Sequence, residues 1–278
     1  MTSSSTWRCL QVATAAIAML AGTTAAEAQM ASDRYWVQGG VFFPKIRSEF
    51  QLSAPGVGLN GTVLGFERDL GLKDTGTLAA FAAGVRLGDN WRLGAEYYGL
   101  GRTGSAALKR SIVVDNVVYP AAAAITSRFK TDVYRATVGY SFLRGENYEV
   151  GGALGLHMTN FDVSLSGIGS VGGQTAATQV RRRDLLAPLP TLGLYAGWQP
   201  APKLQLGARI DYLKLGISDY TGRLINAEAS IGYRVVDHLS FGAMYRFVDY
   251  RVTVAKPIWV GEVRYRFHGP ALFVQLGF

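Results

Sequence analysis

The sequence predicts an all-β chain that closes into an antiparallel transmembrane β-barrel of about ten strands, within a range of eight to twelve. Three observations lead to this prediction. Apolar and polar residues alternate over long segments, the apolar faces end in aromatic residues, and the chain finishes on an alternating segment with a terminal Phe278. With 49% hydrophobic and 17% charged residues, the chain is too apolar to be disordered.

The first segment has the features of an export signal. Arg8 supplies a positive charge, residues 9–21 form a short apolar run, and residues 26–28 (AEA) form a small-x-small cleavage site. We therefore expect a cleaved signal peptide at 1–28 and a barrel domain at 29–278. The alternative is an ordinary buried helix near the N-terminus. Because Cys9 is the only cysteine, the mature chain would contain no disulfide.

The mature chain lacks an apolar segment suited to a transmembrane helix. Residues 185–202 carry no charge and are long enough to span a membrane, but they include four prolines. Proline breaks a helix because it removes a backbone donor and clashes with the preceding turn. An exported, apolar chain without a helical span is either a soluble periplasmic or secreted β protein or an outer-membrane barrel.

Strict alternation of apolar and polar residues favours the barrel. Residues 204–212 (LQLGARIDY) place every even-numbered, apolar residue on one strand face and Gln, Gly, Arg and Asp on the other. The same pattern occurs at 91–98, 134–142, 225–235 and 239–247. These segments approach the 9–11 residues that a tilted transmembrane strand needs.

Aromatic residues end many of the apolar faces, as in the interfacial girdles of membrane barrels. These residues are Trp91, Tyr97, Tyr140, Trp198, Tyr212, Tyr233, Tyr245 and Phe278.

Short polar breaks predict the periplasmic turns, at 88–90, 144–147, 199–203 and 236–238. Asp115-Asn116 predicts a long outer hairpin, which would bring Trp91 opposite about Tyr140. We expect the other outer loops at 53–76, 167–182, 216–220 and 254–258. The apolar residues of 53–76 suggest that this loop folds over or into the barrel mouth. An even strand count places both termini in the periplasm.

The C-terminal segment carries a resemblance to known proteins. Leu272, Val274, Leu276 and Phe278 alternate and end the chain on an aromatic residue. This pattern resembles Gram-negative outer-membrane β-barrel proteins. The resemblance implies location in the outer membrane of a Gram-negative bacterium and recognition of the last strand by the barrel-assembly machinery.

More narrowly, residues 67–72 (ERDLGL) and 186–194 (LAPLPTLGL) resemble an uncharacterised proteobacterial barrel family with no established activity. One irregularity remains near the end of the chain. The apolar parity switches around Gly269-Pro270, which predicts a bulge in one long last strand; the alternative is a turn.

The polar faces predict a charged lumen. Because barrels of about eight strands fill their interior with side chains, we expect these charges to pair and plug a narrow lumen. A structural or surface-interaction role follows. The alternative is a small, anion-preferring channel, given the excess of arginines. The predicted inward set is Arg86, Arg92, Glu96, Arg135, Glu149, His157, Arg209, Asp211, Glu228, Arg234 and Arg246.

We expect no catalytic, cofactor-binding or metal site. His157 lies in mid-strand near Ser164 and Ser166, but no Ser/His/acid spacing resembles a lipid A deacylase, and the aspartates are scattered. A lipid A-modifying hydrolase that uses His157 remains as the alternative.

The chain has a formal net charge of +8. Arg181, Arg182 and Arg183 form a basic run at the outer end of a strand, which suggests contact with lipopolysaccharide phosphates; a solvated loop end is the alternative. Basic residues spread over strands in this compartment do not support nucleic-acid binding. The expected partners are therefore outer-membrane lipids, lipopolysaccharide and the assembly machinery, and we expect a monomer.

Overall fold

The computed structural model describes residues 33–53, 63–114, 117–171, 174–185, 189–217, 220–256 and 259–278. The predicted signal peptide at 1–28 lies outside the described residues. Among the described residues, no helix is long and apolar enough to cross a membrane.

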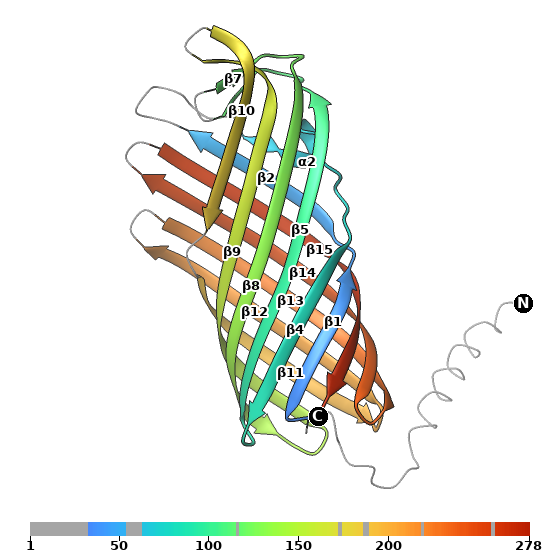
Figure 1. Ribbon diagram of the computed structural model, residues 1–278. Helices are drawn as coiled ribbons and strands as arrows, with labels where there is room; N and C mark the ends of the chain where they lie inside the picture. The colour runs from blue at the N-terminus through green and yellow to red at the C-terminus, as the bar shows by residue number, and fades with distance from the viewer. Residues whose placement is uncertain are drawn as a thin grey trace, which may run out of the picture.

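Ten antiparallel strands form a closed ring, which confirms the predicted fold class (Figure 1). Each strand pairs with its neighbour in the ring, and β1 closes it by pairing with β15. Closure leaves no sheet edge in the membrane, where an unpaired backbone group is costly. The ring strands in spatial order are β1 (Tyr35–Phe42), β4 (Leu78–Leu87), β5 (Trp91–Ala107), β8 (Ala124–Arg144), β9 (Tyr148–Val171), β11 (Leu189–Ala201), β12 (Leu204–Ile217), β13 (Tyr220–Val236), β14 (Leu239–Lys256) and β15 (Trp259–Gly277).

Both ends of the described chain lie at the rim that carries the short turns. Tyr35 and Phe278 exchange two backbone hydrogen bonds of 2.9 and 2.8 Å there. In the turn between β4 and β5, Gly88 has a φ of +61°, a left-handed conformation that favours glycine. Short turns of bacterial barrels face the periplasm, so this rim is the periplasmic one.

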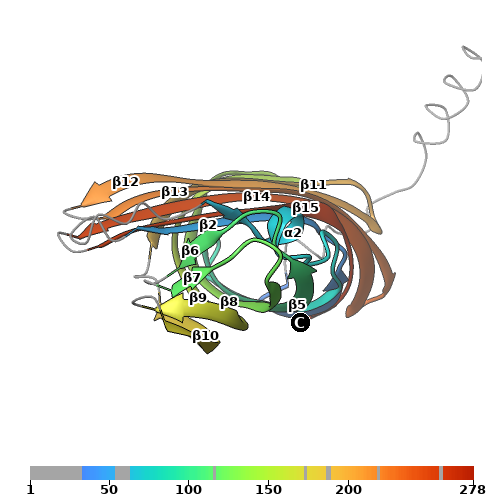
Figure 2. The same ribbon diagram turned by 90° about the horizontal axis from the view of Figure 1, so that it is seen from above.

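Above the ring, the strands separate into two sheets (Figures 1 and 2). On one side, β2 (Lys45–Ser53) continues the line of β1 and extends the sheet of β12 to β15 by pairing with β15. On the other, β10 (Gln174–Leu185) pairs with β9 and extends the sheet of β5, β8 and β9. The upper half is therefore an extension of two facing sheets.

Short elements occupy the upper end between these sheets. The first long loop forms β3 (Leu64–Gly65) and one helical turn, α2 (Phe66–Asp69). The tip of the outer hairpin forms β6 (Ile112–Val114) and β7 (Val117–Tyr119).

The pairing of the outer hairpin follows the sequence prediction. Trp91 lies opposite Tyr140, as the folding of the chain about 115–116 requires. The predicted loop at 167–182 is wrong over most of its length, because β9 runs to Val171 and β10 begins at Gln174. This part of the hairpin lies beyond the membrane, and its outer face meets water. Small polar residues therefore form paired strands here, without the alternation of apolar and polar residues that marks a strand in lipid.

The apolar face of each long strand changes sides at the outer membrane boundary. On β14, Phe241 and Tyr245 face outward and are 48% and 52% exposed. Farther along the same strand, Val248 and Tyr250 face inward and are 4% and 5% exposed. The lipid around the lower half favours apolar residues outside, whereas water around the upper half favours them inside.

This change of face also explains the parity switch near the C-terminus. The pairing of β14 with β15 keeps one register from Leu239↔Leu276 to Lys256↔Trp259. The predicted bulge at Gly269-Pro270 is therefore wrong. Above this point Tyr265 and Phe267 face the interior, whereas below it Leu272 faces lipid.

The predicted aromatic residues lie on the outer surface in two girdles, with exposed fractions of 37–61%. The pair Trp91 and Tyr140, with ring centroids 5.1 Å apart, belongs to the periplasmic girdle. Tyr97, Tyr212 and Tyr245 belong to the outer girdle. On β5, Trp91 and Tyr97 are separated by about 20 Å along the strand, and the apolar residues between them face lipid.

Candidate functional site

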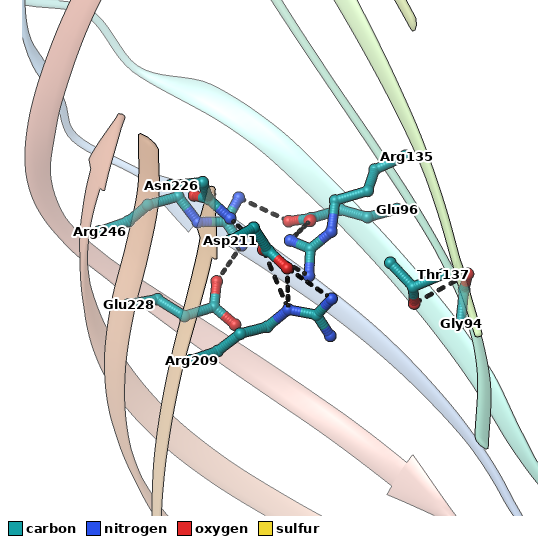
Figure 3. A network of polar contacts seen from close by, with 9 residues as sticks. All are labelled: Gly94, Glu96, Arg135, Thr137, Arg209, Asp211, Asn226, Glu228 and Arg246. Carbon is teal, nitrogen blue, oxygen red and sulfur yellow. Dashed lines mark hydrogen bonds and ion pairs between the residues drawn. The ribbon is translucent and has the colours of Figure 1, made fainter. Parts of the chain in front are cut away.

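A layer of buried ion pairs crosses the lumen near mid-height (Figure 3). Glu96 accepts from Arg135 at 2.9 Å and from Arg246 at 2.5 Å. Arg246 also donates to Glu228 at 2.7 Å. Glu96 therefore joins β8 to β14 across the interior, and each arginine is balanced by carboxylates.

Asp211 is the second centre of this layer and is only 1% exposed. It accepts from Arg209 at 2.8 Å and from the amide of Asn226 at 3.0 Å. Arg135 reaches the same carboxylate at 3.4 Å, so the two centres form one network. Such partners offset the high cost of burying charge.

Strand register explains much of this geometry. Glu96 lies directly opposite Arg135, and Glu228 lies between Arg209 and Arg246 on its two neighbouring strands. Opposite charges at such cross-strand positions are mutually stabilising.

A second cluster lies nearer the periplasmic rim. Glu149 is 3% exposed and pairs with Arg86 at 2.9 Å, and it also contacts Arg92 and Ser141. The Ser141 hydroxyl lies 2.8 Å from that of Tyr195. At the rim itself, Arg234 pairs with Asp33 at 3.3 Å. The contacts around Glu149 tie β4, β5, β8, β9 and β11 together from inside, and the Arg234 pair holds the segment before β1 against β13.

A cavity of about 290 Å³ lies below the mid-height layer and reaches the periplasmic turns at Asn147 and Gln199. Arg92 and Glu149 line it from the periplasmic cluster, and Glu96, Arg135 and Arg246 line it from the mid-height layer. Polar and apolar side chains both line the cavity, which lies in the periplasmic half, so the ion-pair layer separates it from the extracellular half.

Above the ion-pair layer, the interior becomes aromatic. Phe129 stacks on Phe161 with a centroid distance of 5.9 Å and contacts the edge of Tyr265 at 5.6 Å. These three side chains are 2–4% exposed. Offset and edge-to-face packing of this kind excludes water and adds to the stability gained from burial.

The first long loop closes the upper end, as the sequence predicted for the mouth. Leu64, Phe66 and Leu70 are at most 1% exposed. Below them, Arg102 donates to Glu67 at 2.5 Å and to Ser48 at 2.8 Å. Ion pairs, aromatic rings and the loop thus occupy the lumen at three successive levels.

All eleven predicted lumen residues face the interior, but their surroundings differ. His157 is 5% exposed, and its Nδ1 atom has no hydrogen-bond partner in the described part of the chain. Arg92 is the most accessible, with 39% of its side chain exposed. Among the described residues, no group of three His, Cys, Asp or Glu side chains is placed to hold a metal ion.

Sequence reasoning missed several members of these clusters. Asn226 stands on the polar face of an alternating segment, and Arg102 continues the parity of Arg92 and Glu96, so extending the alternation would have found both. Tyr195 and Ser141 carry no charge signal, and only the pairing of strands brings Ser141 to Glu149 and Tyr195 to Ser141.

Two further predictions concern the outside of the barrel. Arg181, Arg182 and Arg183 lie on β10, and their side chains are outside the described part of the structure. Their contact with lipopolysaccharide stays a prediction. The C-terminal residues Leu272, Val274, Leu276 and Phe278 face outward, with exposed fractions of 40–61%, and their role in assembly also stays a prediction.

The chain is similar to several solved structures of outer-membrane proteins. The outer membrane protease OmpT of Escherichia coli aligns with a TM-score of 0.56 and 12% identity, over 92% of this chain and 99% of OmpT. The toluene transporter TodX of Pseudomonas putida aligns with a TM-score of 0.36 and 9% identity, over 91% of this chain and 92% of TodX. Ail, the attachment invasion locus protein of Yersinia pestis, aligns with a TM-score of 0.28 and 10% identity, over 86% of this chain and 98% of Ail. No family model and no curated protein sequence matches the chain.

The protein is an outer-membrane β-barrel. The closed ring and the likeness to OmpT give the fold, and the exposed apolar band between two aromatic girdles gives the membrane location. At 12% identity the likeness concerns fold alone. The narrower resemblance to one proteobacterial barrel family stays a prediction.

The buried network predicts that removing one carboxylate charge lowers the stability of the barrel strongly. Glu96→Gln removes the carboxylate shared by Arg135 and Arg246, and should lower the free energy of unfolding by about 3 kcal/mol, because buried charges lose a partner. Urea unfolding in lipid vesicles measures this. The control Asp89→Asn affects a carboxylate that is 96% exposed and should change stability by less than about 0.5 kcal/mol. Equal effects of the two substitutions would contradict the network.

Proposed function

We propose that the protein is a non-enzymatic outer-membrane barrel of structural or surface-interaction type, with a salt-bridged and closed lumen. The observation that carries this proposal is the filling of the lumen at three levels, by the Glu96 and Asp211 layer, the Phe129 cluster and the loop around Phe66. A lumen closed in this way supports a role outside the barrel. The expected absence of bound cofactors belongs to the same proposal.

The extracellular extension is the surface that such a protein would present. β8 and β9 contain 21 and 24 residues, whereas a tilted transmembrane strand needs about 9–11. About half of each strand therefore extends beyond the membrane. The extension has its own hydrophobic core, which includes Phe50, Phe129 and Tyr250. A packed core holds the outer hairpin in a defined position, which supports contact with partners at the cell surface.

A small anion-preferring channel is the second candidate. The cavity of about 290 Å³, with Arg92 and Arg209 in its lining, is the observation that favours it. Ion passage would require both the buried ion pairs and the aromatic cluster to separate. Removing buried charges from their partners is costly, so the closed form is favoured.

Partners of the membrane-embedded part are also proposals. We expect outer-membrane lipids around the apolar band, the barrel-assembly machinery as a transient partner of the last strand, and a monomer. The alternating outward residues from Leu272 to Phe278 support recognition of that strand.

Conductance distinguishes a closed barrel from a channel. The purified, refolded protein should give no discrete current steps in a planar bilayer under a salt gradient, because its lumen is filled. Insertion is confirmed separately by protease protection of reconstituted vesicles. Discrete, anion-selective steps from inserted protein would contradict the proposal and support the channel.

A His157→Ala variant tests the enzyme alternative. His157 lies inside the barrel and is 5% exposed, so a lipid in the outer leaflet has no direct approach to its ring. Lipid A from cells that express the variant should have the same mass spectrum as lipid A from cells that express the wild type. If lipid A lost an acyl chain or a phosphate in cells that express the wild type but not in cells that express the variant, the non-enzymatic assignment would be wrong.

A further inference from the structure

We propose that one side of the barrel binds the phosphate groups of lipopolysaccharide through a band of outward-facing cations that begins directly above the outer aromatic girdle. This basic band spans β12, β13, β14, β15 and β2 and is distinct from the arginine run on β10. The proposal does not depend on the state of the lumen. The band consists of Lys45, Arg47, Lys214, Arg223, Arg251, Arg264 and Arg266.

Strand register aligns these cations in rows across the sheet. Lys214 lies opposite Arg223, Arg223 opposite Arg251, and Arg251 opposite Arg264. One row nearer the membrane, Arg266 lies opposite Arg47. Side chains at such positions are about 5 Å apart at their Cβ atoms, so four pairs of neighbouring strand positions bring like charges together.

Carboxylates on the same surface balance only part of this charge. Asp249 pairs with Arg266 at 2.6 Å, Glu262 contacts Arg251 at 3.5 Å and also Arg264, and Glu49 lies 3.7 Å from Arg264. These three acids face seven basic residues, which leaves a net charge of +4.

Four members of the band lack such a partner. Among the described residues, no ion pair with a carboxylate is formed by Lys45, Arg47, Lys214 or Arg223. Directly opposed like charges destabilise a sheet, and an external anion that bridges them would remove that cost.

The band begins at the level of lipid phosphates and extends outward from it. Tyr212 and Tyr245 mark the outer girdle. Lys214 follows Tyr212 by two positions on the same face of β12, about 7 Å along the strand, and Arg251 follows Tyr245 by six positions on β14, about 20 Å along the strand. Side chains from the first of these levels outward meet the head groups of the outer leaflet, which in Gram-negative outer membranes is lipopolysaccharide. Arginine pairs especially well with phosphate because its planar donors bind two oxygens at once.

The surface is also hollowed at the membrane side of the band. A cavity of about 600 Å³ is lined by Phe43, Lys45, Lys73, Tyr245 and His268, among others. Two ammonium groups next to two aromatic rings suit a molecule that combines phosphate with acyl chains. This cavity therefore agrees in chemistry and position with the proposed ligand.

The facing sheet carries its cations differently. At the same height, the outward residues of β5, β8 and β9 include two cations, Arg128 and Lys130, and two carboxylates, Asp132 and Asp162, which balance them. The arginine run 181–183 lies on β10, which extends this sheet beside β9. The continuous row of opposed cations across four strands is therefore a feature of the basic band, and charge balance on β5, β8 and β9 makes these strands a suitable control surface.

The test compares two variants that lose the same charge. Arg223→Gln, Arg251→Gln and Arg264→Gln are combined in one variant, and Lys109→Gln, Arg128→Gln and Lys130→Gln in a matched control. All six positions are on the outside of the barrel, and circular dichroism of the refolded proteins confirms that each variant folds. The dissociation constant for detergent-solubilised bisphosphorylated lipid A is measured for both variants and for the wild type.

We expect the band variant to bind bisphosphorylated lipid A at least tenfold more weakly than the wild type, and the control variant to stay within about twofold. Dephosphorylated lipid A should bind wild type and band variant equally, and free inorganic phosphate should not compete at equal concentration. If both variants bound lipid A equally more weakly than the wild type, net charge alone would explain the effect, and the proposed binding site would be contradicted. Competition by free phosphate would overturn the lipid as its ligand.

Discussion

Each long strand of this protein passes from lipid into water, and this change of surroundings determines where its side chains point. Below the outer girdle, apolar residues such as Phe241 face lipid and polar residues fill the interior. Above it, the outside is aqueous, so Val248 and Tyr250 of the same strand turn inward. The charged lumen, the aromatic cluster and the two-sheet extension all follow from this single inversion.

The inversion also explains why charges fill the interior of the lower half. Lipid excludes ionised groups from the outer surface there, so the polar residues of each strand converge on a narrow lumen. Glu96 and Asp211 then serve as centres that bind arginines from several strands. Because each buried charge needs a partner, the network ties strands together that are not neighbours in the ring. Toward the extracellular side, the outer surface regains charge above the girdle, where the basic band begins.

Sequence reasoning succeeded where one rule applied and failed where the rule changed. Alternation predicted the lower strands, the pairing of Trp91 with Tyr140 and the inward direction of Arg135 and Asp211. It did not predict that these two residues meet at 3.4 Å, because their strands are not adjacent and their approach depends on the curvature and stagger of the whole ring. The parity switch at Gly269-Pro270 was interpreted as a bulge, although it marks the point where lipid gives way to water.

The most direct test of this account is a spin-label scan along β14, with accessibility to oxygen and to a water-soluble nickel complex measured in vesicles. Labels at Phe241 and Tyr245 should collide with oxygen, and a label at Arg251 should collide with nickel. Labels at Val248 and Tyr250 should collide with neither, because both positions lie in the packed interior. Strong oxygen collisions at Val248 and Tyr250 would place the apolar face in lipid along the whole strand and contradict the inversion.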